Sequence, residues 1–264
     1  MDLKLPPKPS QTSRSSLRWT APVSLLAAVF LWWLITRLTD LPAFILPSPI
    51  EVAVRFWKAI IAGNLLGNAA ATLIEVLLGL LAGTSAAVVL AYAIAKSRLF
   101  DQLVSPYLVA TQAIPIVAIA PLLVIWLGPG MRSKVLICAL IVFFPVLVNT
   151  VVGLRAVPGP LHDLMGSLRA SRAQTLRYLE LPAALPILLG GLRIGATLSV
   201  IGAIVGELVG SNQGLGFLIN VARGQYDTAL VFVAVITLIL LALILYGIVA
   251  FAENKLLVWR DERR

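Results

Sequence analysis

Charged residues are scarce in this chain. Only 12% of its 264 residues are Asp, Glu, Lys or Arg, whereas a soluble domain carries about 25%. Apolar residues make up 59%, and the mean hydropathy is +0.96. So few charges cannot cover a folded globule in water, and so apolar a chain does not stay disordered. The composition therefore excludes an ordinary soluble enzyme and indicates a protein whose solvent is a lipid bilayer.

Cysteine and histidine are nearly absent. The single cysteine, Cys138, excludes an internal disulfide, and the single histidine, His162, leaves no histidine-based zinc site. No Ser/His/Asp constellation can be assembled. The Gly-x-x-x-x-Gly-Lys-Ser/Thr loop that cradles ATP phosphates is missing as well. We therefore expect a non-catalytic chain with no cofactor and no metal, whose energy must come from a partner.

Long stretches without charge mark the expected membrane spans. A helix needs about 20 apolar residues to cross the hydrocarbon core. We predict an all-α polytopic membrane protein with about six transmembrane helices, near residues 20–39, 66–95, 103–127, 135–153, 184–209 and 229–252. The membrane domain then covers 19–254. Residues 1–18 form a disordered tail, and 255–264 form a second tail.

The net charge of +9 is distributed unevenly along these spans. An even number of spans puts both termini on one side, and 14 Lys and Arg residues fall on that side against 6 on the other. The positive-inside rule predicts cytoplasmic N and C termini for such a pattern. The basic excess thus indicates contact with membrane lipid in the cytoplasmic membrane of a prokaryote, and no nucleic acid partner.

A short helix is predicted outside the spans, after the first of them. Ser48 is a favoured N-cap residue, and Pro49 suits the first helical position. We expect this helix at the outer interface, with Phe56 and Trp57 near the lipid headgroups.

The longest polar stretch between spans runs from Arg155 to Pro182 and is compatible with helix. Ser171 can cap a helix that begins near Arg172, and Pro182 is expected to end that helix before the next span. A short amphipathic helix exposed between two spans can dock into a groove on a soluble partner. An inert surface loop with scattered arginines is the alternative.

Residues 163–182 read DLMGSLRASRAQTLRYLELP, which resembles the coupling segment of ABC transporter permeases. That pattern is Glu-Ala-Ala, three residues, Gly, nine residues, Ile-x-Leu-Pro. Asp163 takes the place of Glu and Leu179 that of Ile, and Leu181-Pro182 matches. The departures are Leu164 and Met165 for the two alanines, and Arg169 for the glycine that would permit a tight turn.

Four further stretches resemble the permeases of nitrate, sulfonate, taurine and bicarbonate importers, whose relatives serve riboflavin or thiamine-precursor uptake. They are Leu46–Pro49, Ile114–Gly128, Gly190–Arg193 and Gly214–Phe217. The resemblance implies a type I ABC importer fold. Two permease copies, here a homodimer, would form the pore, a cytoplasmic ATPase dimer would bind the coupling segment 160–181, and an extracytoplasmic binding protein would deliver the substrate. The ATPase contacts it implies are Asp163, Ser167, Arg169, Ala170, Ser171, Arg172, Leu179, Leu181 and Pro182.

Polar residues inside the expected spans are candidates for the transport pathway or its gate, because charge is costly in the bilayer. Glu207 either lines the pathway or reaches water at the interface. Glu75 shares a helical face with Asn68 and Thr72, and either joins a buried hydrogen-bond cluster or meets substrate. Gln112, one turn before a proline, either satisfies a freed carbonyl or faces a pore. Arg193 is expected to extend to the cytoplasm.

Glycines four residues apart predict close helix approach in the fifth span. These glycines are Gly191, Gly195, Gly202, Gly206 and Gly210. The spacing fits packing within one subunit or between two.

Two functions are consistent with these features. The first is the permease of an ATP-driven importer that moves a small solute by alternating access. The solute would be a sulfonate- or nitrate-type anion, riboflavin or a thiamine precursor. The second is an ion-gradient-driven secondary transporter that uses Glu75 and Glu207, against which the absence of an internal inverted repeat is weak evidence.

Overall fold

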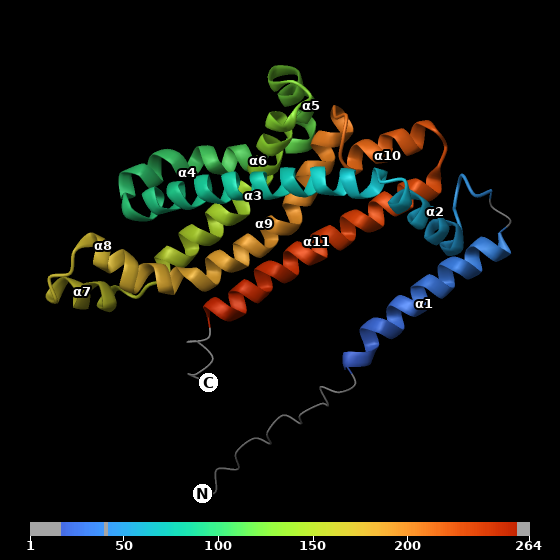
Figure 1. The fold of residues 1–264 in the computed structure, drawn as a ribbon. Coiled ribbons are helices and arrows are strands. Elements are labelled where there is room, and N and C mark those ends of the chain that lie inside the picture. The colour runs from blue at the N-terminus through green and yellow to red at the C-terminus, as the bar shows by residue number, and fades with distance from the viewer. Residues whose placement is uncertain (1–16, 40–41, 258–264) are drawn as a thin grey trace, which may run out of the picture.

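The computed structural model describes residues 17–39 and 42–257, and within these ranges the chain forms helices and no strand (Figure 1). The predicted all-α class is confirmed for this part of the chain. In order, the helices are α1 Leu17–Leu38, α2 Pro49–Ile61, α3 Asn64–Lys96, α4 Arg98–Gln112, α5 Ile116–Leu127, α6 Met131–Arg155, α7 Gly159–Ser167, α8 Arg172–Thr175, the π-helical turn η1 Leu176–Glu180, α9 Leu181–Val209, α10 Leu215–Gly224 and α11 Thr228–Leu256.

Four helices of the described chain are long and apolar enough to cross a membrane. They are α3, α6, α11 and the helix formed by α8, η1 and α9 together. A fifth span exists if α4 and α5, which are bent by 96°, count as one. The remaining expected span coincides with α1, where the described apolar stretch Pro22–Leu38 is shorter. The chain is therefore a multi-pass membrane protein.

The expected single span 103–127 is instead two helices. α4 ends at Gln112, and Pro115 is the N-cap of α5. Proline has no backbone N–H and disfavours helical geometry at the residue before it. The chain breaks at Pro115, although Pro106 and Pro121 lie inside α4 and α5.

The centre of the molecule is α6, which packs between α3 and α9. An added Cβ at Gly79 of α3 would lie 2.2 Å from Cβ of Cys138 in α6, and one at Gly202 of α9 would lie 2.8 Å from the Cα of Cys138. Gly191, Gly195 and Gly206 also face α6. The glycine spacing therefore serves packing within one chain, because the three backbones approach too closely for side chains.

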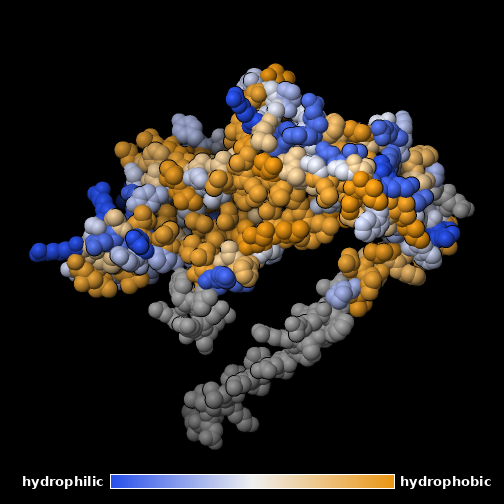
Figure 2. Space-filling model, in the orientation of Figure 1, coloured by the Kyte–Doolittle hydropathy of each residue, from blue (hydrophilic) through white to orange (hydrophobic). Residues whose placement is uncertain are grey.

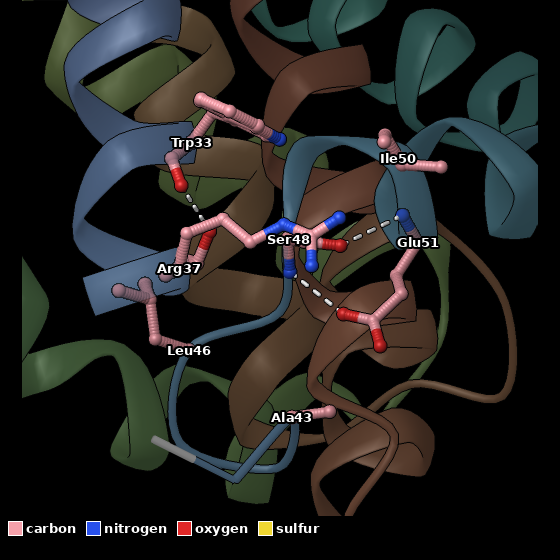
Figure 3. A pocket seen from close by; sticks show the side chains of 8 residues that line it. Trp33, Arg37, Ala43, Leu46, Ser48, Ile50 and Glu51 are labelled. Carbon is pink, nitrogen blue, oxygen red and sulfur yellow. Dashed lines mark hydrogen bonds between the residues drawn. The ribbon is translucent and has the colours of Figure 1, made fainter. Parts of the chain in front are cut away.

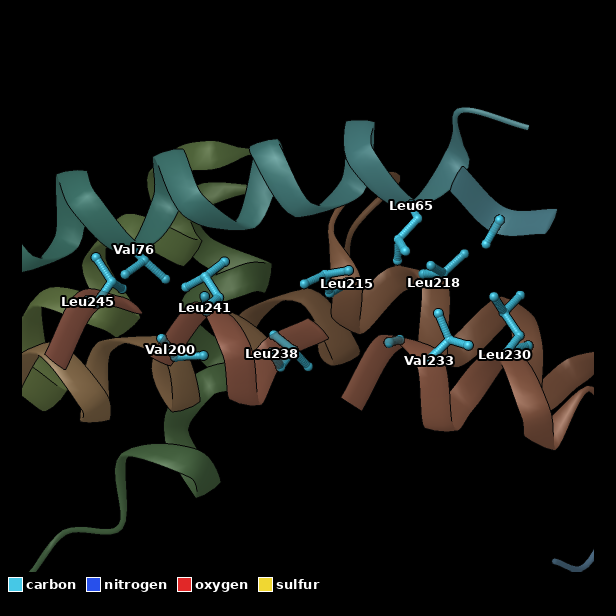
Figure 4. Packing of buried hydrophobic residues seen from close by; sticks show 14 of the residues in the cluster. Leu65, Val76, Val200, Leu215, Leu218, Leu230, Val233, Leu238, Leu241 and Leu245 are labelled. Atoms are coloured by element: carbon cyan, nitrogen blue, oxygen red, sulfur yellow. The ribbon is translucent and has the colours of Figure 1, made fainter. Parts of the chain in front are cut away.

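An apolar cluster joins α3, α9, α10 and α11 beside this centre (Figure 4). Its larger members include Leu65, Val76, Val200, Leu215, Leu218, Leu230, Val233, Leu238, Leu241 and Leu245. α1 reaches the cluster through Trp32, whose ring stacks on Phe232 with centroids 5.3 Å apart. Most of the other described side chains of α1 are exposed, so α1 is only loosely attached to the bundle.

α2 begins as the sequence predicts. Ser48 caps it in a reciprocal capping box with Glu51, and Pro49 is its first residue. A pocket of about 300 Å³ lies between the end of α1 and this cap (Figure 3). Arg55 binds Asp227 at 2.7 Å, which fastens α2 to the start of α11.

The visible surface is apolar across the long helices and hydrophilic near α7 and α8 and around α5 and α10 (Figure 2). Hydrophilic residues therefore gather toward the ends of the long helices, where a membrane protein meets water. The expected tails lie almost wholly outside the described residues. At the C-terminus, α11 itself continues to Leu256, slightly beyond the expected boundary.

Candidate functional site

The α7–α8 hairpin stands at one end of the molecule (Figure 1). α7 closes with two hydrogen bonds that define a Schellman motif: the N–H of Ala170 donates to the carbonyl of Met165 at 3.0 Å, and that of Arg169 to Gly166 at 2.9 Å. Arg169 has φ +52°, the left-handed conformation that such a turn requires. The tight turn is thus kept although arginine replaces the glycine of the coupling pattern.

α8 begins as the sequence predicts. The Oγ of Ser171 accepts from the N–H of Gln174 at 3.3 Å, and the N–H of Ser171 donates to Oε1 of Gln174 at 2.7 Å. This capping box satisfies two donors, one of them an otherwise free N–H of the first helical turn. The direction of α8 is therefore set by the residue that follows the α7 turn.

The prediction that Pro182 ends this helix is wrong. α8, η1 and α9 form one continuous helix, Arg172–Val209, of 38 residues. The turn before the proline is π-helical, and the N–H of Leu181 donates to the carbonyl of Leu176, five residues back. A proline ring clashes with the carbonyl four residues earlier, and the wider π turn accommodates that ring without a break.

The coupling segment is mostly exposed. Leu164, Leu168 and Tyr178 are 54%, 69% and 68% exposed. These are large side chains with apolar surface, and they lie in a hydrophilic part of the molecule. Of the predicted ATPase contacts, Ala170, Leu179 and Pro182 are half-buried, while the others are exposed, namely Asp163, Ser167, Arg169, Ser171, Arg172 and Leu181. The hairpin therefore offers leucines beside arginines to a partner.

Glu180 ties this hairpin to the bundle. Its Oε1 accepts an ion-pair hydrogen bond from Lys96 at the end of α3, and lies 3.1 Å from Nε2 of His162 in α7. The side chain of Glu180 is only 2% exposed. We did not expect these contacts, because the coupling pattern leaves position 180 open.

Glu207 lies near the other end of α9 and organises the α9–α10 loop. Its Oε1 accepts from the hydroxyl of Thr72 at 2.6 Å, and its Oε2 from the N–H of Gly216 at 2.6 Å. The hydroxyl oxygen of Thr72 in turn accepts the N–H of Leu215 at 2.8 Å. The carboxylate is fully buried within the chain, so it holds α3, α9 and the start of α10 together.

A second carboxylate, Glu75, pairs with Lys134 of α6 at 2.5 Å, and the same ammonium donates to Oγ of Ser211 at 2.7 Å. Both charged side chains are at most 2% exposed. We call Thr72, Glu75, Lys134, Glu207 and Ser211 the polar cluster. Glu75 bonds the unforeseen cation Lys134, whereas Asn68 and Thr72, which share its helical face, bond Gly214 and Glu207 instead.

The polar cluster explains two glycines of the Gly214–Phe217 stretch. Gly214 has φ +109°, and a Cβ there would lie 2.1 Å from Oε1 of Glu207. A Cβ on Gly216 would lie 2.8 Å from Cβ of Glu207. Glycine at these positions lets the loop backbone approach the carboxylate closely enough to bond it.

The other candidates lie apart from this cluster. Gln112 ends α4 and lines a separate cavity of about 160 Å³, which Asp101 and Arg155 also line. Arg193 pairs with Glu253, and its guanidinium lies 5.1 Å from the ring centroid of Tyr246. It thus binds α11 instead of extending freely from the helix.

Known proteins resemble this chain along most of its length. The family model described as "Binding-protein-dependent transport system inner membrane component" matches residues 75–258. The chain is 45% identical over 254 residues to the riboflavin transport system permease protein RibX of Chloroflexus aurantiacus, covering 95% of both chains. It is 34% identical to the formylaminopyrimidine transport permease protein ThiX of Halalkalibacterium halodurans, covering 90% of this chain and 94% of that one. Identity is 31% to the putative aliphatic sulfonates transport permease protein SsuC of Bacillus subtilis, covering 94% and 90%.

Solved structures show the same fold. A chain of the MetNI methionine ABC transporter in an inward-facing conformation matches with a TM-score of 0.60 and 19% identity, covering 74% of this chain and 95% of that one. A chain of an amino acid ABC transporter matches at 0.58 and 18%. Fold, family model and relatives agree, and the protein belongs to the ABC importer permeases, the inner membrane components of binding-protein-dependent transport systems.

Proposed function

We propose that this chain is the membrane-spanning subunit of an ATP-driven importer that moves a small solute across the cytoplasmic membrane of a prokaryote. Two copies form the pore, an ATPase dimer binds the α7–α8 hairpin, and an extracytoplasmic binding protein delivers the solute. Membership in the permease family supports this assembly. The observation that carries it is the exposed hairpin with leucines and arginines on its surface.

The hairpin end faces the cytoplasm in this proposal, together with both termini. Arg155, Arg169, Arg172 and Arg177 lie in or beside the hairpin, as the positive-inside rule favours. Exposed leucines of a short helix can then enter a groove on the ATPase.

Movement of the ATPases reaches the membrane through one continuous helix. α8 and η1 lead into α9 without a break, and α9 packs directly on α6. A push on the hairpin therefore displaces the α3–α6–α9 unit relative to less attached parts such as α1. Alternating access follows if two copies rock against each other. Glu207, at the far end of this helix, is the first candidate for the gate, and Glu75 and Gln112 are the next.

The solute proposed first is a neutral or weakly charged heterocycle, such as riboflavin or a thiamine precursor. Higher identity to the riboflavin permease than to the sulfonate permease supports this order. The polar cluster, with two carboxylates for one ammonium, gives no attraction to an anion. A sulfonate-type anion is the second candidate.

The docking role is tested by purifying the chain together with its ATPase. Deletion of Asp163–Leu179 and the substitution Leu168→Asp are both expected to abolish copurification. Leu99→Asp is the matched control, because Leu99 is 68% exposed, as Leu168 is at 69%, but lies in α4. Undiminished association of the deleted chain would contradict the proposal.

The secondary-transport alternative has its own test. Reconstituted alone in liposomes, with riboflavin as probe and an imposed proton gradient, the chain is expected to transport nothing. In the structure Glu207 already accepts two hydrogen bonds and Glu75 is paired with Lys134, which supports an architectural role over a proton relay. Gradient-driven uptake without ATP would favour the alternative.

A further inference from the structure

Only one of the two carboxylate oxygens of Glu180 has hydrogen-bond partners. Both of its contacts, from Lys96 and from His162, reach Oε1. Oε2 is buried and has no hydrogen-bond partner. A buried acceptor without a donor is costly, so such groups call for an explanation.

Space for a second arrangement surrounds the same three side chains. Lys96, His162 and Glu180 line two cavities, one of about 440 Å³ and one of about 200 Å³. The larger cavity also touches Arg172 and Ala170 of the α7–α8 hairpin. The two donors, Lys96 and His162, therefore have open space beside Glu180 in which to change position.

The backbone at this position is also deformable. Glu180 is the last residue of the π turn between α8 and α9. Single π turns are rare and are frequent at functional sites. Glu180 thus connects three parts of the structure that a push on the hairpin would displace. It contacts α7 through His162 and α3 through Lys96, and its own backbone continues into α9.

We propose that Glu180 is the positioning residue that keeps α7 attached to α3 and α9 while the hairpin moves, by exchanging its donors between Oε1 and Oε2. This inference rests on the proposed ATPase docking. It assigns a role to the open position of the Ile-x-Leu-Pro pattern. Two discrete arrangements of one contact are what a coupled movement requires.

The experiment places two spin labels on the chain in complex with its ATPase in lipid nanodiscs, in a Cys138→Ala background. Gly159→Cys labels α7, where an added Cβ meets no heavy atom within 4 Å, and Ala183→Cys labels an exposed position of α9. The distance between the labels is measured with and without ATP. The labelled chain with Glu180 and His162 intact is expected to give one narrow distance distribution, and this distribution is expected to shift when ATP is added.

Glu180→Gln and His162→Ala are expected to broaden the distribution and to abolish the ATP-dependent shift while the ATPase still copurifies. Glu180→Asp keeps the carboxylate and is expected to restore the shift. Arg55→Gln is the matched control, because it removes the ion pair with Asp227 between α2 and α11, neither of which lines the two cavities beside Glu180.

The outcomes separate the inference from the proposed function. A normal ATP-dependent shift in both Glu180→Gln and His162→Ala overturns the role of Glu180. If Glu180→Gln does not fold, His162→Ala decides alone, since His162 is 39% exposed and its loss spares the core. Failure of the parent chain to bind its ATPase refutes the proposed function itself.

Discussion

Glu180 directly precedes α9 and Glu207 lies in its last turn, and the two bind α3 near its opposite ends. Glu180 pairs with Lys96 at the last residue of α3, and Glu207 accepts from Thr72 near its beginning. A buried carboxylate is stable only with donors, so each one fixes the elements that supply them. At the scale of single residues, a few polar contacts thus determine how α9 is aligned with α3.

Lys134→Met is expected to destabilise the protein by about 3–5 kcal/mol, because it leaves Glu75 buried without its cation. The measurement is the apparent unfolding temperature of the detergent-solubilised chain. Adding Glu75→Gln is expected to recover most of the loss. Arg132→Met, at an exposed position two residues earlier, is the control and should change nothing.

Arg169→Gly is expected to stabilise the α7 turn by roughly 1 kcal/mol, because glycine adopts a positive φ without the Cβ penalty. Docking of the ATPase should then be intact or tighter, as measured by its dissociation constant. Leu168→Gly, whose φ is −79°, should lack this gain. Loss of transport in Arg169→Gly would show that the arginine itself touches the partner.

At the scale of elements, the α3–α6–α9 unit is held by backbone contact. Gly79 of α3 and Gly202 of α9 press on the same residue of α6, Cys138. The Glu75–Lys134 and Gly79–Cys138 pairs are both 59 residues apart, so one register of α3 on α6 serves the ion pair and the close packing together. A shift of either helix along the other would therefore disturb both the ion pair and the close packing.

Gly202→Leu is expected to lower the free energy of unfolding by about 1–3 kcal/mol, because the side chain would overlap the α6 backbone. Gly190→Leu is the matched control on the same helix, where an added Cβ meets no heavy atom within 4 Å. The readout is again thermal unfolding in detergent. Equal unfolding temperatures for the two variants would contradict the close packing of α9 on α6.

At the scale of the whole molecule, an apolar belt separates two polar regions (Figure 2). The hairpin lies at one end, and the polar cluster, with the α9–α10 loop, lies toward the other. α9 connects the two. In the proposed function, this arrangement would let movement at the hairpin reach the polar cluster through one helix.

The purified assembly is expected to contain two copies of this chain for every two ATPases, because one chain contributes one hairpin. Native mass spectrometry of the complex measures this ratio. A heterodimer with a second permease would appear as a single copy of this chain per complex and would contradict the homodimer.

Much of the fold follows from local patterns in the sequence. The absence of charge locates the long helices, and Ser48 and Ser171 mark helix starts that the structure contains. Pro115 and Pro182 show where such patterns are insufficient. The first breaks a helix that was expected to continue, and the second is accommodated by a π turn in a helix that was expected to end. Proline removes one donor in both places, but only at Pro182 does a π turn carry the helix past the ring.

The sequence alone determined the membrane class, the helical fold and the coupling pattern, because hydropathy, capping and motif spacing depend on neighbouring residues. Only the tertiary structure decided that Lys134 is the buried partner of Glu75 and that Glu180 gathers Lys96 and His162. The Glu75–Lys134 and Glu180–Lys96 pairs are 59 and 84 residues apart. Such contacts depend on the register of one helix against another, which close packing at glycines sets and which no local pattern carries.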